Sequence, residues 1–311
     1  MTICVVDIGG TYIRLALSID GRDFTRDPQK IKTEQFACIE EALSYFMLQE
    51  QWLPSTISHI LIAKSGRNYW TLSESSVKEI FQNAKLIMVN DFAANAMGLL
   101  HVIPSDLLYL GGMKKQPDLH FSSAVIGSGT GLGLAYITPD KTIQRTHGGH
   151  MLPALISNEQ RELFDDLQHL KTNKTAPIYE DALSGNGLLS IYKILSNRHH
   201  LDIEYHDTHH LLAEGRNNPL VQQSLKFYHE ILGQFAHQVL AFGYSYGALY
   251  LTGGITDRII SHDLFDNDIF FKSLYQNNVT AVLNDVKETP VFWVKDEFIS
   301  LKGLLHEVVT K

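Results

Sequence analysis

A glycine turn between two apolar runs near the N-terminus constrains the fold of this chain more than any other stretch. Residues 5–17 read Val-Val-Asp-Ile-Gly-Gly-Thr-Tyr-Ile-Arg-Leu-Ala-Leu, which predicts a buried strand, a tight turn and a second strand. Adjacent glycines let backbone N–H groups approach an anion, while Asp7 suits a hydrated Mg²⁺ and Thr11 can donate to a phosphate oxygen. An ordinary hairpin has the same local pattern, so the turn indicates a phosphate site only if further glycine stretches support it.

Two later glycine stretches supply that support. Residues 126–133, Ile-Gly-Ser-Gly-Thr-Gly-Leu-Gly, again join two apolar runs, and residues 249–255, Leu-Tyr-Leu-Thr-Gly-Gly-Ile, end another strand pattern in a glycine pair. Residues 126–133 lead into a strand pattern instead of a helix, so they do not form the dinucleotide-binding fingerprint. Two phosphate hairpins, each opening one lobe, predict a nucleotide held between two similar domains.

Length and charge narrow the class of protein. A chain of 311 residues with 44% hydrophobic residues is long enough for two lobes, each with its own core. The net charge of −8 and the lack of any basic run argue against binding to nucleic acid or to an anionic membrane surface. Cys4 and Cys38 are too few for a disulfide framework, which favours the cytoplasm, and no apolar run reaches the length of about 18 residues that a membrane span needs.

The order of the expected elements is that of an α/β protein. After the hairpin we expect a third strand near residues 35–37 and an amphipathic helix over 39–46. A strand at 59–63, a helix at 75–84 and a strand at 85–89 then read as a βαβ unit, whose ligands belong at the carboxyl ends of the strands. We place a hinge near residues 107–112 and the last helix from about residue 298. The expected lobes are residues 1–110 with about 298–311, and residues 111–297.

Asp91 directly follows the last strand of that unit and precedes a helical pattern. Its carboxylate suits a general base for a sugar hydroxyl, but Asn90-Asp91 before an alanine-rich helix is equally a sound N-cap. The histidines between residues 199 and 210 lack a clear ligand spacing with a carboxylate or thiolate partner, so we interpret them as part of a polar, exposed segment.

Taken together, the motifs resemble bacterial glucokinase over nearly the whole chain. They are residues 7–11 with 14–17, 90–94, 127–133, 148–150, 180–185 and 253–255. The resemblance implies the actin-like ATPase superfamily, with two actin-like (ribonuclease H-like) α/β lobes and a deep interlobe cleft. It further implies an ATP- and Mg²⁺-dependent homodimer that transfers a phosphoryl group to a hexose, most simply to the 6-hydroxyl of glucose.

The same resemblance assigns roles to individual residues. Asp91 matches the catalytic base, Asn90, His150 and Glu180 match residues that hold sugar hydroxyls, and Asp7 is expected to bind Mg²⁺ through water. His147 falls at a further sugar-binding position. The residues expected to hold the nucleotide are Asp7, Gly9, Gly10, Thr11, Gly129, Thr130, Gly131, Gly253 and Gly254.

Three departures from the family pattern concern the sugar site. His147 stands where the family usually has a glutamate, Tyr12 replaces an asparagine, and the segment after Ala63 is shorter and lacks a Thr-Asn pair. Phosphate handling is therefore expected to be intact and sugar handling altered. The alternatives are a kinase for another hexose or an amino sugar, and a sugar or nucleotide sensor that has lost turnover.

Overall fold

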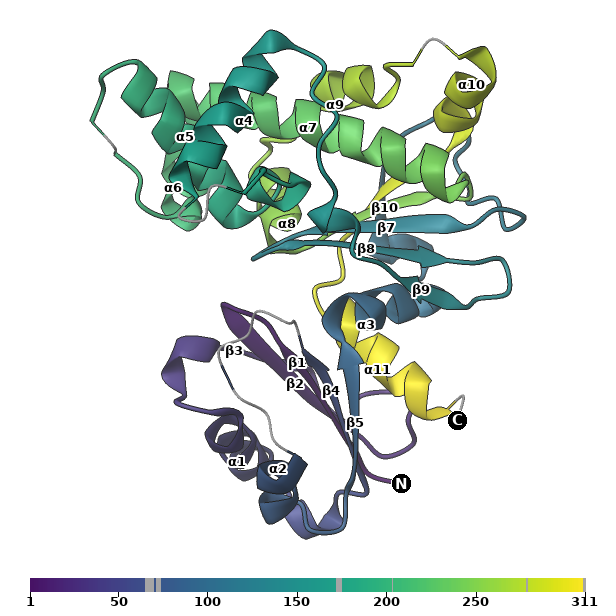
Figure 1. Ribbon diagram of the computed structural model, residues 1–311. Helices are drawn as coiled ribbons and strands as arrows, with labels where there is room; N and C mark the ends of the chain where they lie inside the picture. The colour runs from purple at the N-terminus through teal and green to yellow at the C-terminus, as the bar shows by residue number, and fades with distance from the viewer. Residues whose placement is uncertain (65–69, 71–73, 172–174, 203, 278, 310–311) are drawn as a thin grey trace. The chain divides into compact units, whose positions relative to one another are not determined.

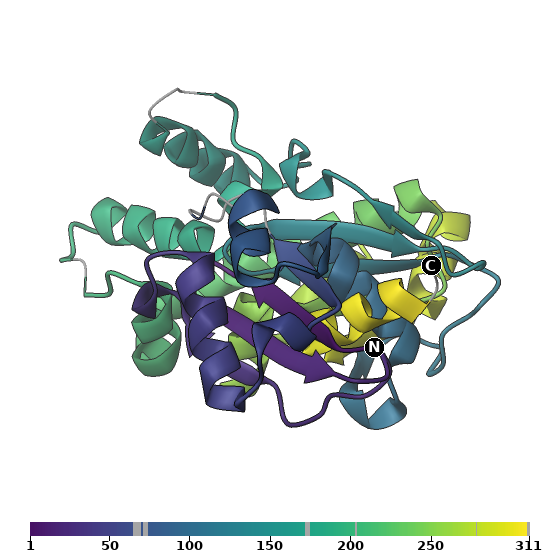
Figure 2. The same cartoon turned by 90° about the horizontal axis from the view of Figure 1, so that it is seen from below.

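The chain folds into two compact units, each with its own sheet. A computed structural model describes residues 1–64, 70, 74–171, 175–202, 204–277 and 279–309. The first unit comprises Met1–Asp106 and Asp296–Lys311, and the second comprises Leu107–Lys295 (Figures 1 and 2).

The first unit contains a five-stranded sheet in the order β3-β2-β1-β4-β5. β2 pairs with β1 and with β3 antiparallel, whereas β4 runs parallel to β1 and to β5. The N-terminal hairpin and the βαβ unit expected from the sequence are therefore neighbours in one sheet. The strands are β1 (Ile3–Ile8), β2 (Tyr12–Ser18), β3 (Gln29–Lys32), β4 (His59–Lys64) and β5 (Lys85–Asn90).

Helices cover both faces of this sheet because β1 is apolar on both sides. Its even-numbered residues, such as Val6, pack with α1 (Ile39–Glu50) and α2 (Glu74–Ile80), and its odd-numbered residues, such as Val5, pack with α3 (Asp91–Gly98) and α11 (Ile299–Val309). Since successive side chains of a strand point to opposite faces, the near-continuous apolar run of β1 needs a helical layer on each side. Figure 1 shows the two pairs of helices on opposite faces of the sheet.

The C-terminal helix α11 packs against α3 at very short range through two glycines. A Cβ atom added at Gly303 would overlap the carbonyl oxygen of Ala94 and lie 2.7 Å from the backbone nitrogen of Gly98. A Cβ atom added at Gly98 would in turn overlap the backbone of Ile299. The absence of side chains at both positions brings the two backbones together, which fixes the N-terminal part of α11 against the middle and end of α3.

We expect Gly303→Ala to destabilise the protein by about 1–3 kcal/mol, because the new methyl group would force the two helices apart. Helix propensity alone predicts the opposite sign, since alanine favours a helix over glycine by about 1 kcal/mol. Urea unfolding followed by circular dichroism measures the difference. Ser44→Ala on the exposed face of α1 is the control and should not destabilise; a stabilised Gly303→Ala variant would contradict the close contact.

The second unit repeats the strand arrangement of the first and extends it. Its sheet has the order β6-β11-β10-β7-β8-β9, in which β7, β8 and β9 are antiparallel neighbours and β10 runs parallel to β7 and β11. The order β9-β8-β7-β10-β11 thus matches β3-β2-β1-β4-β5, which confirms the second copy expected from the glycine motifs. The strands are β6 (Leu107–Gly111), β7 (Ser123–Ser128), β8 (Leu132–Ile137), β9 (Ile143–Arg145), β10 (Leu249–Thr252) and β11 (Val291–Val294).

The long helix α7 (Pro219–Gly243) is the centre of the helical layer of this unit. Its buried residues share one core with Ala124 and Ile126 of β7 and Leu132 and Leu134 of β8. Figure 1 shows α7 crossing above the sheet among the shorter helices. These are α4 (Asn158–Leu170), α5 (Gly185–Arg198), α6 (Thr208–Glu214), α8 (Gly254–Ser261), α9 (Asn267–Leu274) and α10 (Thr280–Glu288).

Two sequence expectations about local structure differ from the fold. The third strand lies at Gln29–Lys32 and not at residues 35–37, where a 3₁₀ helix, η1 (Thr33–Gln35), ends. The alternation of lysines with Gln29 and Ile31 gave this edge strand too weak an apolar signal. The segment interpreted as a hinge, Leu107–Gly111, forms strand β6, which pairs antiparallel with β11 inside the second unit.

Candidate functional site

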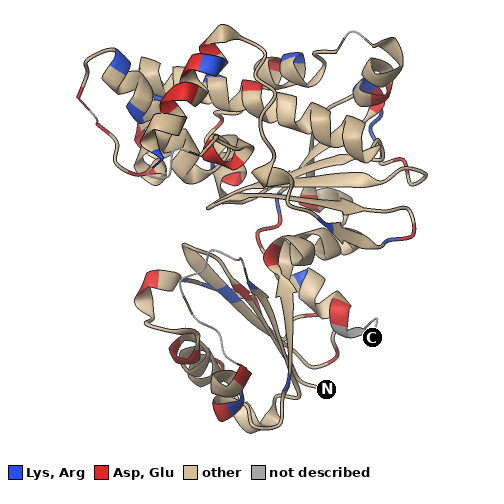
Figure 3. Cartoon of the chain, viewed as in Figure 1, with Lys and Arg blue, Asp and Glu red and all other residues tan. Residues whose placement is uncertain are grey.

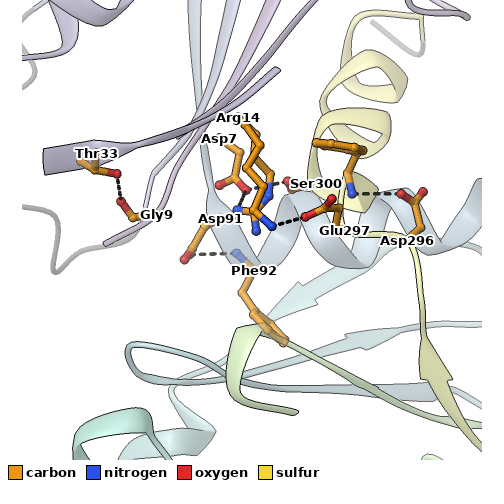
Figure 4. A network of polar contacts seen from close by, with 11 residues as sticks. Asp7, Gly9, Arg14, Thr33, Asp91, Phe92, Asp296, Glu297 and Ser300 are labelled. Atoms are coloured by element: carbon orange, nitrogen blue, oxygen red, sulfur yellow. Dashed lines mark hydrogen bonds and ion pairs between the residues drawn. The ribbon is translucent and has the colours of Figure 1, made fainter. Parts of the chain in front are cut away.

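The first glycine turn connects β1 to β2, and Thr33, which follows β3, stabilises it by hydrogen bonds. The backbone N–H of Gly9 donates to the carbonyl of Tyr12 at 3.0 Å, and the Thr33 hydroxyl donates to the carbonyl of Gly9 at 3.2 Å (Figure 4). The backbone N–H of Thr33 donates to the carbonyl of Thr11 at 3.0 Å. Gly10 and Thr11 at the tip are exposed, so the turn offers its backbone and the Thr11 hydroxyl to a ligand.

Asp7, at the end of β1, is a buried carboxylate held by two side chains. Its cross-strand neighbour is Arg14, whose Nη1 lies 3.3 Å from Asp7 Oδ2, and the Ser300 hydroxyl of α11 donates to the same oxygen at 2.8 Å (Figure 4). Burial raises the pKa of Asp7, and the positive charge of Arg14 opposes that shift. Asp7 and Arg14 are the charged residues of β1 and β2, whose other side chains are uncharged (Figure 3).

The arrangement of Asp7 fits a role near a hydrated metal ion. Arg14 and Ser300 both bind Oδ2, and among the described residues Oδ1 has no hydrogen-bond partner. In the described part of the chain, no group of three or more His, Cys, Asp or Glu side chains would hold an ion by itself. Because Mg²⁺ in nucleotide sites keeps several waters and binds phosphates, one free carboxylate oxygen that can accept from a metal-bound water is what such a site needs from the protein.

Asn90 is the last residue of β5 and Asp91 the first residue of α3, and their side chains make different hydrogen bonds. Asn90 is the N-cap, because its Oδ1 accepts from the backbone N–H of Ala93 at 3.1 Å. Asp91 Oδ1 accepts from the backbone N–H of Phe92 at 2.9 Å and from Asn90 Nδ2 at 3.1 Å. The second oxygen of Asp91 has no hydrogen-bond partner within the described part of the chain. The capping interpretation of the Asn-Asp pair therefore applies to Asn90.

The electrostatic surroundings of Asp91 suit proton transfer near neutral pH. Burial, and secondly the negative charge of Asp7, raise the pKa of Asp91 to about 6, against the opposing hydrogen bond from Phe92. A carboxylate with a raised pKa is a stronger base than an ordinary aspartate, yet it is still ionised above about pH 6. Perturbed carboxylates of this kind gather at functional sites.

In the second unit, three glycine-containing segments converge at the turn between β7 and β8. The Gly185 N–H donates to the carbonyl of Gly129 at 2.9 Å, and an added Cβ at Gly129 would lie 3.8 Å from the nitrogen of Gly254. Helices α5 and α8 thus begin beside the turn, and helix N-termini attract anions. Gly253 has φ +98°, and a Cβ there would lie 2.5 Å from the carbonyl oxygen of Ser128, so this turn requires glycine.

Three of the predicted sugar-binding residues, His147, His150 and Glu180, lie together in the second unit. The rings of His147 and His150 are nearly parallel, 11° apart in angle and 5.8 Å between centroids, and both residues are exposed. His150 Nε2 lies 3.7 Å from Glu180 Oε1. Glu180 itself is 5% exposed, and its Oε2 accepts from the backbone N–H of Leu132 at 2.8 Å, which fixes the carboxylate beside the glycine turn.

The structure thus brings the predicted residues into two groups, one in each unit. The first unit holds Asp7, Gly9, Gly10, Thr11, Asn90 and Asp91, and the second holds Gly129, Thr130, Gly131, His147, His150, Glu180, Gly253 and Gly254. The shortened segment after Ala63 lies mostly outside the described residues. None of the described helices is long and apolar enough to span a membrane.

Sequence reasoning missed the partners that orient these groups. Ser300 is 293 residues away from Asp7 along the chain, so no local pattern links them. Arg14 was visible in the motif, and its cross-strand position opposite Asp7 follows from the hairpin register, which offered a signal for the pair. The contact between Glu180 and the N–H of Leu132 depends on tertiary folding alone.

The duplicated sheet with a phosphate-type glycine turn in each unit defines the actin-like class of sugar kinases. The family model described as Glucokinase matches residues 4–310, and the chain belongs to the glucokinase family of sugar phosphotransferases. A glucokinase from Photorhabdus laumondii is 29% identical over 304 residues, which cover 93% of this chain and 91% of the relative.

Solved structures agree with the fold. The structure of glucokinase from Balamuthia mandrillaris in complex with glucose has a TM-score of 0.79 at 19% identity, covering 98% of this chain and 92% of that one. A ROK family glucokinase from Streptomyces griseus, in complex with glucose and AMPPNP, has a TM-score of 0.68 at 16% identity and covers 100% of both chains. At these identities the likeness establishes the actin-like fold.

Proposed function

We propose that the protein transfers the γ-phosphoryl group of ATP to a hexose, with the 6-hydroxyl of glucose as the first choice. The observation that carries this proposal is Asp91, a carboxylate with one oxygen fixed by Phe92 and Asn90 and the other without a partner among the described residues. A sugar hydroxyl is a weak nucleophile, and a positioned carboxylate that accepts its proton contributes about 10²–10⁴-fold to the rate.

The remaining residues would divide between nucleotide and sugar. We assign the phosphates to the turns Gly9–Thr11 and Gly129–Gly131 and the adenosine to Gly253 and Gly254. Asp7 would hold Mg²⁺ through water, with the nucleotide phosphates as its other ligands; the ion supplies charge neutralisation at the transferring phosphoryl group. Asn90, His147, His150 and Glu180 would bind sugar hydroxyls, because amide, imidazole and carboxylate groups satisfy both the donors and the acceptors of a polyol.

A kinase for another hexose or an amino sugar is the second candidate, and His147 is the observation that favours it. The imidazole occupies a position where the family usually has a carboxylate, and it stacks on His150 at the predicted sugar contact. Replacing a charged acceptor by a neutral one changes which hydroxyl pattern the site holds best.

The deciding experiment measures ADP release by the full chain with ATP, Mg²⁺ and each member of a panel of hexoses and amino sugars. Release with glucose above the sugar-free rate supports the first proposal, and ³¹P NMR of the product identifies the phosphorylated hydroxyl. Release with another sugar alone supports the second candidate. Binding of sugar and nucleotide without release from any sugar would contradict both and identify a sensor.

We expect His147→Glu to raise kcat/KM for glucose by about tenfold. Hydrogen bonds to charged partners contribute about 1.5–3 kcal/mol, against about 0.5–1.5 kcal/mol for neutral ones. The measurement compares glucose with sugars altered at single hydroxyls, and His209→Glu, on the exposed face of α6, is the matched control. Unchanged kcat/KM for every sugar would place His147 outside the sugar site.

We also propose that the two compact units are the lobes of the enzyme, with limits near the predicted 110 and 298, and that the protein is a cytoplasmic homodimer. The family resemblance supports the dimer. Sedimentation equilibrium of the purified chain tests it, and a monomer at micromolar concentration would contradict it.

A further inference from the structure

Three hydrogen bonds join the turn between β7 and β8 to residues 180–185, which lead from the 3₁₀ helix η6 (Tyr179–Asp181) into α5. The donors and acceptors are the Leu132 N–H and Glu180 Oε2 at 2.8 Å, the Ser128 hydroxyl and the Leu183 carbonyl at 2.7 Å, and the Gly185 N–H and the Gly129 carbonyl at 2.9 Å. Ser128 and Glu180 are both buried. The turn that we assign to phosphate and the segment that carries a predicted sugar ligand are therefore tied together within the second unit.

Gly131, the residue before Leu132, leaves the space that the Glu180 carboxylate fills. A Cβ atom added at Gly131 would overlap Glu180 Oε2 and lie 3.3 Å from its carboxyl carbon, and the three nearest atoms all belong to this carboxyl group. Gly131 is not among the glycines with positive φ, so the backbone conformation does not itself require glycine. A side chain at this position would therefore displace the carboxylate, which is the movable end of the Glu180 side chain.

The start of β8 supports a second predicted sugar residue, His150. A Cβ atom added at Gly149 would overlap the carbonyl oxygen of Leu132, so the 3₁₀ helix η5 (Gly148–His150) packs on the residue whose N–H binds Glu180. His150 Nε2 lies 3.7 Å from Glu180 Oε1. Leu132 thus contacts both groups, Glu180 through its N–H and the helix of His150 through its carbonyl.

A methyl group at position 131 would displace the Glu180 carboxylate by about 1 Å, the difference between the overlap and an ordinary contact distance. The backbone N–H of Leu132 would then lose a charged acceptor, because hydrogen bonds weaken steeply outside about 2.7–3.2 Å. The carboxylate would also leave the place from which it reaches a sugar hydroxyl. A misplacement of about this size in a positioned group can cost about 100-fold in rate.

From the hydrogen bonds between the turn and residues 180–185, and from the space at position 131, we infer that Gly131 is a positioning residue of the sugar site. It acts through Glu180, although it belongs to the turn that we assign to phosphate. The inference rests on the proposed function, because that function assigns Glu180 to a sugar hydroxyl. One glycine of the second unit therefore serves both ligands: it keeps the turn open to phosphate and leaves room for the carboxylate that binds the sugar.

The test measures the binding of radiolabelled glucose to the full chain by equilibrium dialysis without any nucleotide. We expect Gly131→Ala to weaken glucose binding at least about tenfold, although no phosphate is present for the turn to hold. Gly129→Ala is the matched control in the same turn, because a Cβ atom there would lie 3.8 Å from the Gly254 nitrogen, an ordinary contact, and no atom of Glu180 would lie within 4 Å. This control should bind glucose as the wild type does.

A double-mutant cycle with Glu180→Ala distinguishes positioning from a general disturbance of the turn. Without the carboxylate the space beside position 131 is vacant, so Gly131→Ala should then change glucose affinity by less than about twofold. Urea unfolding supplies the same cycle for stability: the methyl group should destabilise the wild type and not the Glu180→Ala variant. The stability measurement decides the cycle where the affinity of Glu180→Ala for glucose is too low to measure.

Wild-type affinity of Gly131→Ala for glucose would overturn the inference and leave the proposed function in place. An equal loss with and without the Glu180 carboxylate would also overturn it, and would assign position 131 to the shape of the turn alone. A wild type that binds no glucose would contradict the proposed function for this sugar, and with it the role of Gly131 in the sugar site.

Discussion

Replacing Asp91 with asparagine should lower kcat at least about 100-fold and leave nucleotide binding unchanged. The amide has nearly the shape of the carboxylate, and its oxygen can still accept the backbone N–H of Phe92, which lies 2.9 Å from Oδ1 in the wild type. What the variant loses is a group that can take a proton from the attacking hydroxyl.

The same variant should be as stable as the wild type or more stable. The helix cap stays, since Asn90 and not Asp91 accepts from Ala93. Burial and the charge of Asp7 raise the pKa of Asp91 from 3.8 to about 6. The unfolded chain therefore loses this proton at lower pH than the folded chain does. Ionisation of Asp91 thus destabilises the folded protein, and this destabilisation is absent below about pH 4 and complete above about pH 6. Asparagine removes this cost of about 1–3 kcal/mol at neutral pH.

Steady-state kinetics, nucleotide titration and urea unfolding at about pH 7.5 check these expectations together. Asp20→Asn, at an exposed turn carboxylate of the same unit, is the control and should keep wild-type kcat. A variant at position 91 with near wild-type kcat would exclude Asp91 as the base. A variant that is both inactive and clearly less stable would indicate a structural role instead.

Much of the fold could be predicted because glycine turns and apolar runs are local signals. Residues 5–17 specify a hairpin by themselves, and their repetition around residue 129 predicts the duplicated strand order that the two sheets share. Where apolar content is low, the prediction was wrong. The edge strand β3 contains two lysines in four residues, and only its pairing with β2 defines it.

The sequence indicated which residues belong to the candidate site, but not the contacts that hold those residues in place. Asp7 and Asp91 each follow an apolar strand, which is a sequence signal for the carboxyl end of a sheet. The contacts that set their properties join distant segments: Ser300 reaches Asp7 from the last helix, and Glu180 reaches the N–H of Leu132. The Gly98–Gly303 contact that brings α11 beside α3 likewise has no local pattern.

The influence of Asp7 on Asp91 leads to the second large expected effect, on pH dependence. If Asp91 must be ionised to accept a proton, kcat/KM of the wild type should fall below about pH 6, since the pKa of Asp91 is about 6. Activity at about pH 5 should then be roughly tenfold lower than at about pH 7.5, because only about one carboxylate in eleven remains ionised. The loss should be reversible within the range where the protein stays folded.

Asp7→Asn should shift the fall of kcat/KM on the acidic side of the pH profile, here called the acidic limb, to lower pH. The negative charge of Asp7 is the second cause of the raised pKa of Asp91, after burial, so its removal makes Asp91 easier to ionise. The amide still accepts a hydrogen bond from Ser300, which donates to Asp7 at 2.8 Å in the wild type. Loss of the charge at the proposed Mg²⁺ site should lower the rate at every pH, so the informative quantity is the pH at which kcat/KM falls and not the rate itself.

A full profile of kcat/KM between about pH 4.5 and 8.5, for the wild type and Asp7→Asn, separates the two effects. Glu50→Gln is the matched control, because Glu50 is a buried carboxylate of the same unit, 7% exposed, paired with Arg26 and Gln29. This control should leave the limb near pH 6. A limb that stays in place in Asp7→Asn would show that the charge of Asp7 does not act on the base, and a profile without any acidic limb would mean that proton transfer to Asp91 does not limit the reaction.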